Sequence, residues 1–259
     1  MKRFVSKKAL IAVGILVLLG IGGFVTFSLV STVPVTPPAD VVEKAPVPLH
    51  TVIGKSVEGR NIDAYQYGNG PIHLLFVGGI HGGYEWNSVA LAYQLIDYLN
   101  QRPETISEKL TVAIVPSANP DGVYKVTGKS GRFTEAEIPP TKLPLGTGRF
   151  NAHDVDLNRN FDCKWKQRST WQGRPVSAGT QPFSEPEAAT LRDYVENFTP
   201  TGVVFWHSKA NGVYASQCEK GILPETLTLM DIYADASGYR PIKTFDAYAV
   251  TGAGEDWLA

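Results

Sequence analysis

Cysteine is scarce in this chain: only Cys163 and Cys218 occur among its 259 residues, and no CxxC motif is present. A zinc site built from clustered cysteines is therefore excluded, because such sites need closely spaced thiolates. The two thiols could form one disulfide in an oxidising compartment or remain separate buried thiols, and the sequence leaves both alternatives open. No cysteine lies near the apolar N-terminal segment, which excludes a lipid-modified cysteine anchor.

An excess of charge of either sign is also missing, because 24 Lys and Arg face 25 Asp and Glu, for a net charge of -1. A balanced chain has no electrostatic reason to bind nucleic acid, so no nucleic-acid partner is expected. The first acid is Asp40, whereas Lys2, Arg3, Lys7 and Lys8 precede it, which leaves the remainder mildly acidic. A hydrophobic content of 43% permits a sizeable core.

Residues 1–30 contain a long uncharged apolar run that extends from Ala9 to Val30. About 20 apolar residues span a bilayer as a helix, and the preceding basic residues should stay in the cytoplasm. A cleaved signal peptide has a shorter apolar region, roughly 7–15 residues, and an A-x-A-like cleavage site. We therefore expect an uncleaved signal anchor that forms one transmembrane helix; a cleaved signal and a buried core helix are the alternatives. The protein is then expected to be a single-pass membrane protein with its body extracytoplasmic, in the periplasm or at the cell surface.

Residues 31–48 contain five prolines and are expected to be an extended linker between the membrane and the folded body. Residues 49–259 are expected to form the folded domain. Short apolar runs there predict strands at 62–67, 72–77, 110–115 and 202–206. Their alternation with helical patterns predicts an α/β fold, with a mixed, mostly parallel central sheet and helices on both faces.

Two segments of the domain show helical signals. One carries apolar residues at helical spacing, which predicts a single buried face made of Leu91, Ala92, Leu95, Ile96 and Leu99. The other begins at a predicted capping box, with Ser184 as N-cap and Glu187 reaching back, and should end near Phe198. Residues 127–148 and 162–182 are expected to be long loops, of the kind that shape a site.

Two of the five histidines, His81 and His207, each follow an apolar predicted strand directly. Parallel strands end at the same edge of a sheet, where α/β proteins bind ligands. A histidine in this place is commonly a structural residue, but Glu85 lies close behind His81 and favours a site. Two histidines and a glutamate are the ligand set of a hydrolytic zinc site.

Residues 149–160 lead into a tight group, 156–161, in which polar residues are unusually dense around a single leucine. A solvated loop held by Asx turns is one interpretation. The other is an anion site, because the planar guanidinium of Arg159 can grip a carboxylate through two parallel hydrogen bonds. Asn158 would add a donor and Arg149 a second cation. A zinc site beside a carboxylate clamp suits the removal of the last residue of a peptide.

Five motifs follow one another in this part of the chain: GGIHGGYE, ANPDG, RxNAxxVDLNRNF, FWHS and YxxTGxxEDW. From residue 51 onward the chain therefore resembles the zinc metallocarboxypeptidases, the family of carboxypeptidases A and B and of bacterial relatives that process cell-wall peptides. The resemblance implies one bound Zn²⁺ ion, proteolysis of peptides with a free C-terminal carboxylate, and cell-wall peptides as one candidate substrate.

The resemblance also implies residue roles at the metal. His81, Glu85 and His207 match the metal ligands, and Arg149 matches the arginine that polarises the scissile carbonyl and stabilises the oxyanion. One departure concerns spacing, because three residues separate His81 from Glu85 where the family has two. Glycines in this interval should let the loop absorb the extra residue.

Further roles concern the substrate. Asn158 and Arg159 match the clamp on its terminal carboxylate, and Tyr248 matches the mobile tyrosine that closes over it. Glu255 matches the floor of the side-chain pocket, where an acid favours a basic terminal residue through charge pairing. A Glu255 that merely faces solvent is the alternative.

The second departure concerns the general base. In the family this glutamate lies on a strand beyond the EDW motif, whereas the sequence ends at Ala259. A general base typically contributes about 10²–10⁴-fold to the rate. We expect C-terminal truncation of an active enzyme; a catalytically silent metal- and peptide-binding module and a zinc deacylase of N-acyl amino acids are the alternatives.

Overall fold

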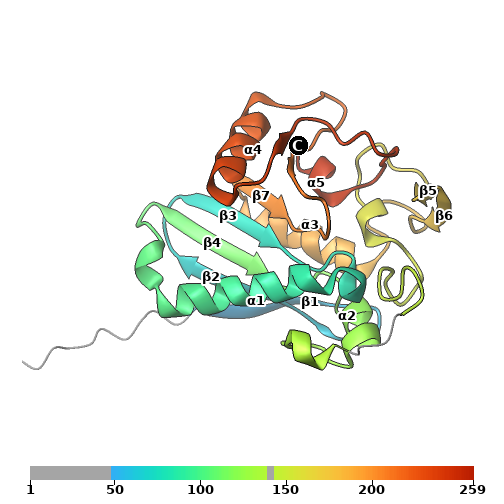
Figure 1. The fold of residues 1–259 in the computed structure, drawn as a ribbon, viewed down its shortest axis with the longest axis horizontal. Coiled ribbons are helices and arrows are strands. Elements are labelled where there is room, and N and C mark those ends of the chain that lie inside the picture. The colour runs from blue at the N-terminus through green and yellow to red at the C-terminus, as the bar shows by residue number, and fades with distance from the viewer. Residues whose placement is uncertain (1–47, 139–142) are drawn as a thin grey trace, which may run out of the picture. The chain divides into compact units, whose positions relative to one another are not determined.

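The computed structural model describes residues 48–138 and 143–259 (Figure 1). The predicted anchor, residues 1–30, lies outside the described residues, as does the predicted linker apart from Pro48. No helix of the described part is both long enough and apolar enough to cross a membrane. The described residues, and every element they form, belong to one compact unit.

A five-stranded sheet in the order β1-β2-β4-β3-β7 forms the centre of this unit. Its strands are β1 (Leu49–Lys55), β2 (Asn61–Gly68), β3 (Ile72–Val77), β4 (Leu110–Val115) and β7 (Gly202–Phe205). β3 runs parallel to β4 and β7, whereas β2 runs antiparallel to β1 and β4. The mixed sheet is confirmed, but it is not mostly parallel, because β1 was not predicted and half of the strand pairings are antiparallel.

Helices cover both faces of the sheet, as predicted (Figure 1). Successive side chains of β3 point to opposite faces because a strand alternates with period two. Leu75 belongs to the core that includes Leu191 of α3 (Pro186–Phe198), and Leu74 packs against the core beneath α1 (Trp86–Gln101). The two cores anchor the sheet whose edge carries the candidate site.

The remaining elements surround this sheet. They are α2 (Pro120–Thr127), β5 (Arg168–Trp171), β6 (Arg174–Ser177), β8 (Val213–Tyr214), α4 (Pro224–Ser237), β9 (Pro241–Ile242) and α5 (Gly254–Trp257). The prediction of a loop over 162–182 is wrong in part, because β5 and β6 form an antiparallel hairpin there. Their two-residue turn has positive φ at both Gln172 and Gly173, the geometry that suits the twist of a hairpin.

The predicted buried face of α1 is wrong at one position. Leu91 is 43% exposed, whereas Ala92, Ile96 and Leu99 are buried. The buried stripe begins at Val89 and continues at three- and four-residue steps, so Leu91 falls beside it.

The predicted capping box at Ser184 is also wrong. α3 begins at Pro186, and the residue before it, Glu185, has the extended values φ -89° and ψ 137°. A proline disfavours helical geometry in the preceding residue, so the helix cannot include Glu185 and Ser184 cannot be its N-cap. The predicted helix end at Phe198 is confirmed.

Cys163 and Cys218 form a disulfide, which decides between the two alternatives that the sequence left open. The bridge links residues 55 positions apart and so restricts the unfolded chain. We expect the Cys163→Ser/Cys218→Ser variant to lose about 2–4 kcal/mol of unfolding free energy in urea titrations. Reduction of the unaltered chain should reproduce this loss, and equal stability of the oxidised and bridgeless chains would contradict the prediction.

Candidate metal centre

The carboxyl ends of β3 and β7 bring His81 and His207 together. The two strands are parallel neighbours, with Val77 opposite Phe205. His207 follows β7 after one residue, and His81 follows β3 after a short glycine-containing turn. Their ring centroids lie 5.0 Å apart, so the predicted convergence at one sheet edge is confirmed.

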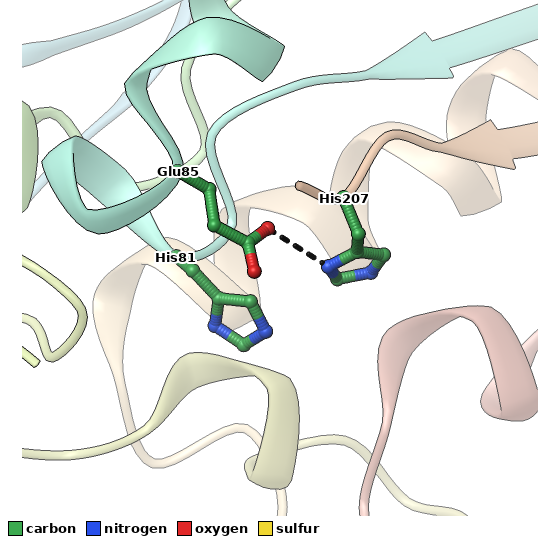
Figure 2. A group of neighbouring side chains, drawn as sticks. All are labelled: His81, Glu85 and His207. Carbon is green, nitrogen blue, oxygen red and sulfur yellow. Dashed lines mark hydrogen bonds and ion pairs between the residues drawn. The ribbon is translucent and has the colours of Figure 1, made fainter. Parts of the chain in front are cut away.

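Glu85 reaches the same place through a one-turn 3-10 helix, Gly82–Glu85. Gly82 has φ +47°, and a Cβ there would lie 2.5 Å from the carbonyl oxygen of Gly148. This tight turn accommodates the longer spacing between His81 and Glu85. Although Glu85 precedes α1, its side chain caps no backbone group of that helix. Its Oε2 instead accepts hydrogen bonds from His207 Nδ1 and from the backbone N–H of Ser208, each at 3.1 Å (Figure 2).

These three side chains fit a zinc ion. One candidate ligand atom from each of His81, Glu85 and His207 lies within 4.8 Å of the others, and this is the one such group in the described part of the chain. His81 and Glu85 are buried, at 4% and 7% exposed. Two imidazoles and one carboxylate form the donor set of catalytic zinc sites, which keep a fourth position open.

The surroundings set opposite proton affinities for the two histidines. Burial lowers the pKa of His81 well below its ordinary value, and the positive charge of Arg149 lowers it further. Burial also opposes protonation of His207, but the hydrogen bond and charge of Glu85, followed by the charge of Glu255, outweigh it and raise its pKa. His81 is therefore held neutral, as a metal ligand must be, whereas the contacts of His207 favour its protonated form.

Asp156 also lies at this centre, although the sequence analysis assigned it no role. It is fully buried, and its Oδ2 accepts a hydrogen bond from Arg149 Nε at 3.0 Å and forms an ion pair with Arg149 Nη2 at 2.9 Å. Its Oδ1 lies 3.6 Å from His81 Nδ1. The signal was its place in the polar cluster, two residues before Asn158. Asp156 thus joins the guanidinium of Arg149 to one of the candidate metal ligands.

Asn158 and Arg159 lie in the same neighbourhood but are engaged internally. Arg159 is 2% exposed and donates to the carbonyl oxygens of Asn158 at 2.6 Å and Thr170 at 3.3 Å. Its buried Nε has no hydrogen-bond partner in the described structure. Asn158 accepts from the N–H of Gly254 at 2.9 Å and donates to Glu255 Oε1 at 3.1 Å.

Tyr248 and Glu255 differ in where the structure places them. The Tyr248 ring packs edge-on against Phe245, with centroids 4.9 Å apart, and no hydrogen bond or ring contact among the described residues joins it to the metal centre. Glu255 lies beside the centre, with Oε1 3.8 Å from His207 Nε2. The alternative that Glu255 merely faces solvent does not hold, because its Oε2 is buried.

The family model described as zinc carboxypeptidase matches residues 39–250. A curated relative, gamma-D-glutamyl-L-diamino acid endopeptidase 1 of Lysinibacillus sphaericus, is 25% identical over 228 residues, 80% of this chain and 56% of that protein. The inactive metallocarboxypeptidase ECM14 of Ajellomyces capsulatus is 32% identical over 162 residues, 57% of this chain and 25% of that protein. The chain thus spans about half or less of the length of these curated relatives.

Solved structures show the same fold. Carboxypeptidase A from Helicoverpa armigera superposes with a TM-score of 0.60 at 21% identity, covering 82% of this chain and 56% of that one. Murein-tripeptide amidase MpaA from Escherichia coli O157 gives a TM-score of 0.55 at 21% identity, covering 85% and 82%. Because the family model spans most of the sequence and the fold agrees with it, the chain belongs to the zinc carboxypeptidase family.

Proposed function

We propose that the protein is a zinc metallocarboxypeptidase that acts outside the cytoplasm. It removes the C-terminal residue of peptides by hydrolysing the last peptide bond. The observation that carries this proposal is the convergence of His81, Glu85 and His207 at the ends of β3 and β7, where His81 and Glu85 are buried. A zinc ion held there would polarise the scissile carbonyl and lower the pKa of a water molecule.

The neighbouring residues have roles that follow from their contacts. Asp156 fixes Arg149 through one hydrogen bond from Nε and an ion pair with Nη2, while Arg149 Nη1 makes no hydrogen bond or ion pair among the described residues and is available to a substrate carbonyl oxygen. Donors fixed where charge develops are an effective form of catalysis. Arg159, with its unpartnered Nε, and Asn158 are proposed to bind the terminal carboxylate after exchanging some of their internal hydrogen bonds.

Two observations support an extracytoplasmic, membrane-anchored location. The sequence begins with basic residues followed by the uncharged apolar run 9–30, the pattern of a signal anchor. The Cys163–Cys218 disulfide is a bond that persists in oxidising compartments and is rare in the cytosol.

The substrate class is proposed from two relatives. One is named a gamma-D-glutamyl-L-diamino acid endopeptidase and the other a murein-tripeptide amidase. These names support cell-wall peptides that contain a diamino acid as candidate substrates of this chain.

The test combines metal content with a matched pair of peptides. After dialysis, the 259-residue chain should hold one zinc ion, measured by elemental analysis, and should bind a peptide acid about tenfold tighter than its C-terminal amide, because charge-assisted hydrogen bonds contribute about 1.5–3 kcal/mol. Release of the terminal amino acid, blocked by a chelator, would establish the reaction. Absence of zinc, or equal affinity for acid and amide, would overturn the proposal.

A catalytically silent metal- and peptide-binding module is the second candidate, and a relative named as an inactive metallocarboxypeptidase favours it. Zinc and peptide binding without release of any amino acid, by a chain extended through the strand that carries the family's general base, would indicate this function. Release of amino acids from N-acyl amino acids, with peptides left intact, would instead indicate the zinc deacylase.

A further inference from the structure

Glu255 stands behind His207 on the side away from the other candidate ligands. His207 Nδ1 faces Glu85, at 3.1 Å, and Nε2 faces Glu255 Oε1, at 3.8 Å. His207 Nε2 and Glu255 Oε2 are both buried, and neither has a hydrogen-bond partner in the described structure. A buried donor and a buried acceptor that lack hydrogen-bond partners destabilise the structure. A small movement of these two neighbouring side chains would let them form a hydrogen bond with each other.

We propose that Glu255 is a positioning residue of the metal centre, whose carboxylate accepts the Nε2–H of His207 and so presents Nδ1 to the metal. This inference rests on the proposed function, because it assumes that zinc binds at His81, Glu85 and His207. Ligating histidines commonly donate their second N–H to a carboxylate, which fixes the tautomer and the ring orientation and makes the ligating nitrogen more basic.

The other imidazole has the same arrangement. His81 Nδ1 lies 3.6 Å from Asp156 Oδ1, and both atoms are buried without a hydrogen-bond partner in the described structure. Each histidine therefore has an outer carboxylate, Glu255 for His207 and Asp156 for His81. Glu85 lies beside both imidazoles (Figure 2). The repeated pattern is what a centre with two oriented imidazoles requires.

The orientation of Glu255 is itself fixed. Asn158 Nδ2 donates to Glu255 Oε1 at 3.1 Å, while Asn158 Oδ1 accepts from Gly254 N–H at 2.9 Å at the start of α5. At the other end of α5, the ring of Trp257 packs against Phe161 and Phe183. A carboxylate held by these contacts is directed at His207, which competes with the pocket-floor role that the family resemblance implies.

The test measures zinc affinity of the 259-residue chain by competition with a chromogenic chelator. We expect Glu255→Ala to weaken zinc binding by about 10- to 100-fold, the range found for outer-shell partners, and Glu255→Gln to weaken it less because an oxygen acceptor remains. The visible absorption spectrum of the Co²⁺-loaded chain should shift in both variants, because the orientation of one ligand changes. Glu196→Gln, an exposed carboxylate on α3, is the matched control and should change neither readout.

Circular dichroism and thermal melting establish that each variant is folded before its affinity is compared. If the unaltered chain binds no zinc, the proposed function fails together with this inference. If the unaltered chain binds one zinc ion and both Glu255 variants keep its affinity and Co²⁺ spectrum, the inference is overturned and the proposed function stands. A changed preference for peptides ending in lysine, with metal binding intact, would likewise overturn it in favour of the pocket role.

Discussion

The His81→Ala variant should lose stoichiometric zinc, with a fall in affinity of more than about 100-fold. This exceeds the roughly 10- to 100-fold effect of losing an outer-shell partner, because a direct ligand is removed from a set of three. His81 is suited to the role because burial and Arg149 keep its imidazole neutral, so no proton has to leave before a metal binds. Isothermal titration of the dialysed chain with zinc measures the change.

The matched control is His50→Ala. His50 is a half-exposed histidine on β1 that also has a carboxylate partner, Asp63, at 2.9 Å. Its loss should leave the zinc affinity of the chain unchanged. If His81→Ala and His50→Ala bind zinc equally well, the metal centre is elsewhere and the assignment of all three ligands fails.

The second large effect is on stability. Asp156→Ala removes the partner of a buried cation, since Asp156 is 0% and Arg149 2% exposed. Breaking a buried ion pair from one side typically destabilises a protein by about 3–5 kcal/mol, because the remaining charge is left unpaired. Urea unfolding of the metal-free chain, with and without the substitution, should show a loss of this size.

Two further variants separate charge from packing. Asp156→Asn keeps the size of the side chain and one acceptor oxygen, so it should lose less stability than Asp156→Ala. The double variant Arg149→Met/Asp156→Ala removes both charges and should recover part of the loss. The double variant could instead lose more unfolding free energy than Arg149→Met and Asp156→Ala lose in total. That result would show that packing around Trp171, 4.4 Å from the guanidinium, dominates.

Strands and helices with one clear signal were predictable from the sequence. The bounds of β3 and β4 agree with the predicted runs, because each is a mainly apolar stretch ended by glycine or proline. α2 was missed although Asn119 and Pro120 offer an N-cap and a first-turn proline. The helix has only eight residues, so its apolar spacing extends over few turns and its start signal was the clearest indication of it.

The sequence could predict the part of the candidate site that lies directly after the ends of strands. His81 and His207 follow neighbouring parallel strands, and topology alone brings them to one edge. The direction in which a loop side chain points depends on tertiary contacts, which no local pattern contains. This is why the partnership of Asp156 with Arg149, and the approach of Glu255 to His207, emerged only from the structure.

The Cys163–Cys218 bridge gives the redox history of a sample a direct bearing on this centre. The bond links the segment just after Phe161 to the segment that follows His207. It therefore connects two separate parts of the chain that surround the metal centre. Protein expressed in a reducing cytosol would lack this disulfide, since thiols there are kept reduced. Secreted and cytosolic preparations of one sequence would then differ in how firmly they hold zinc.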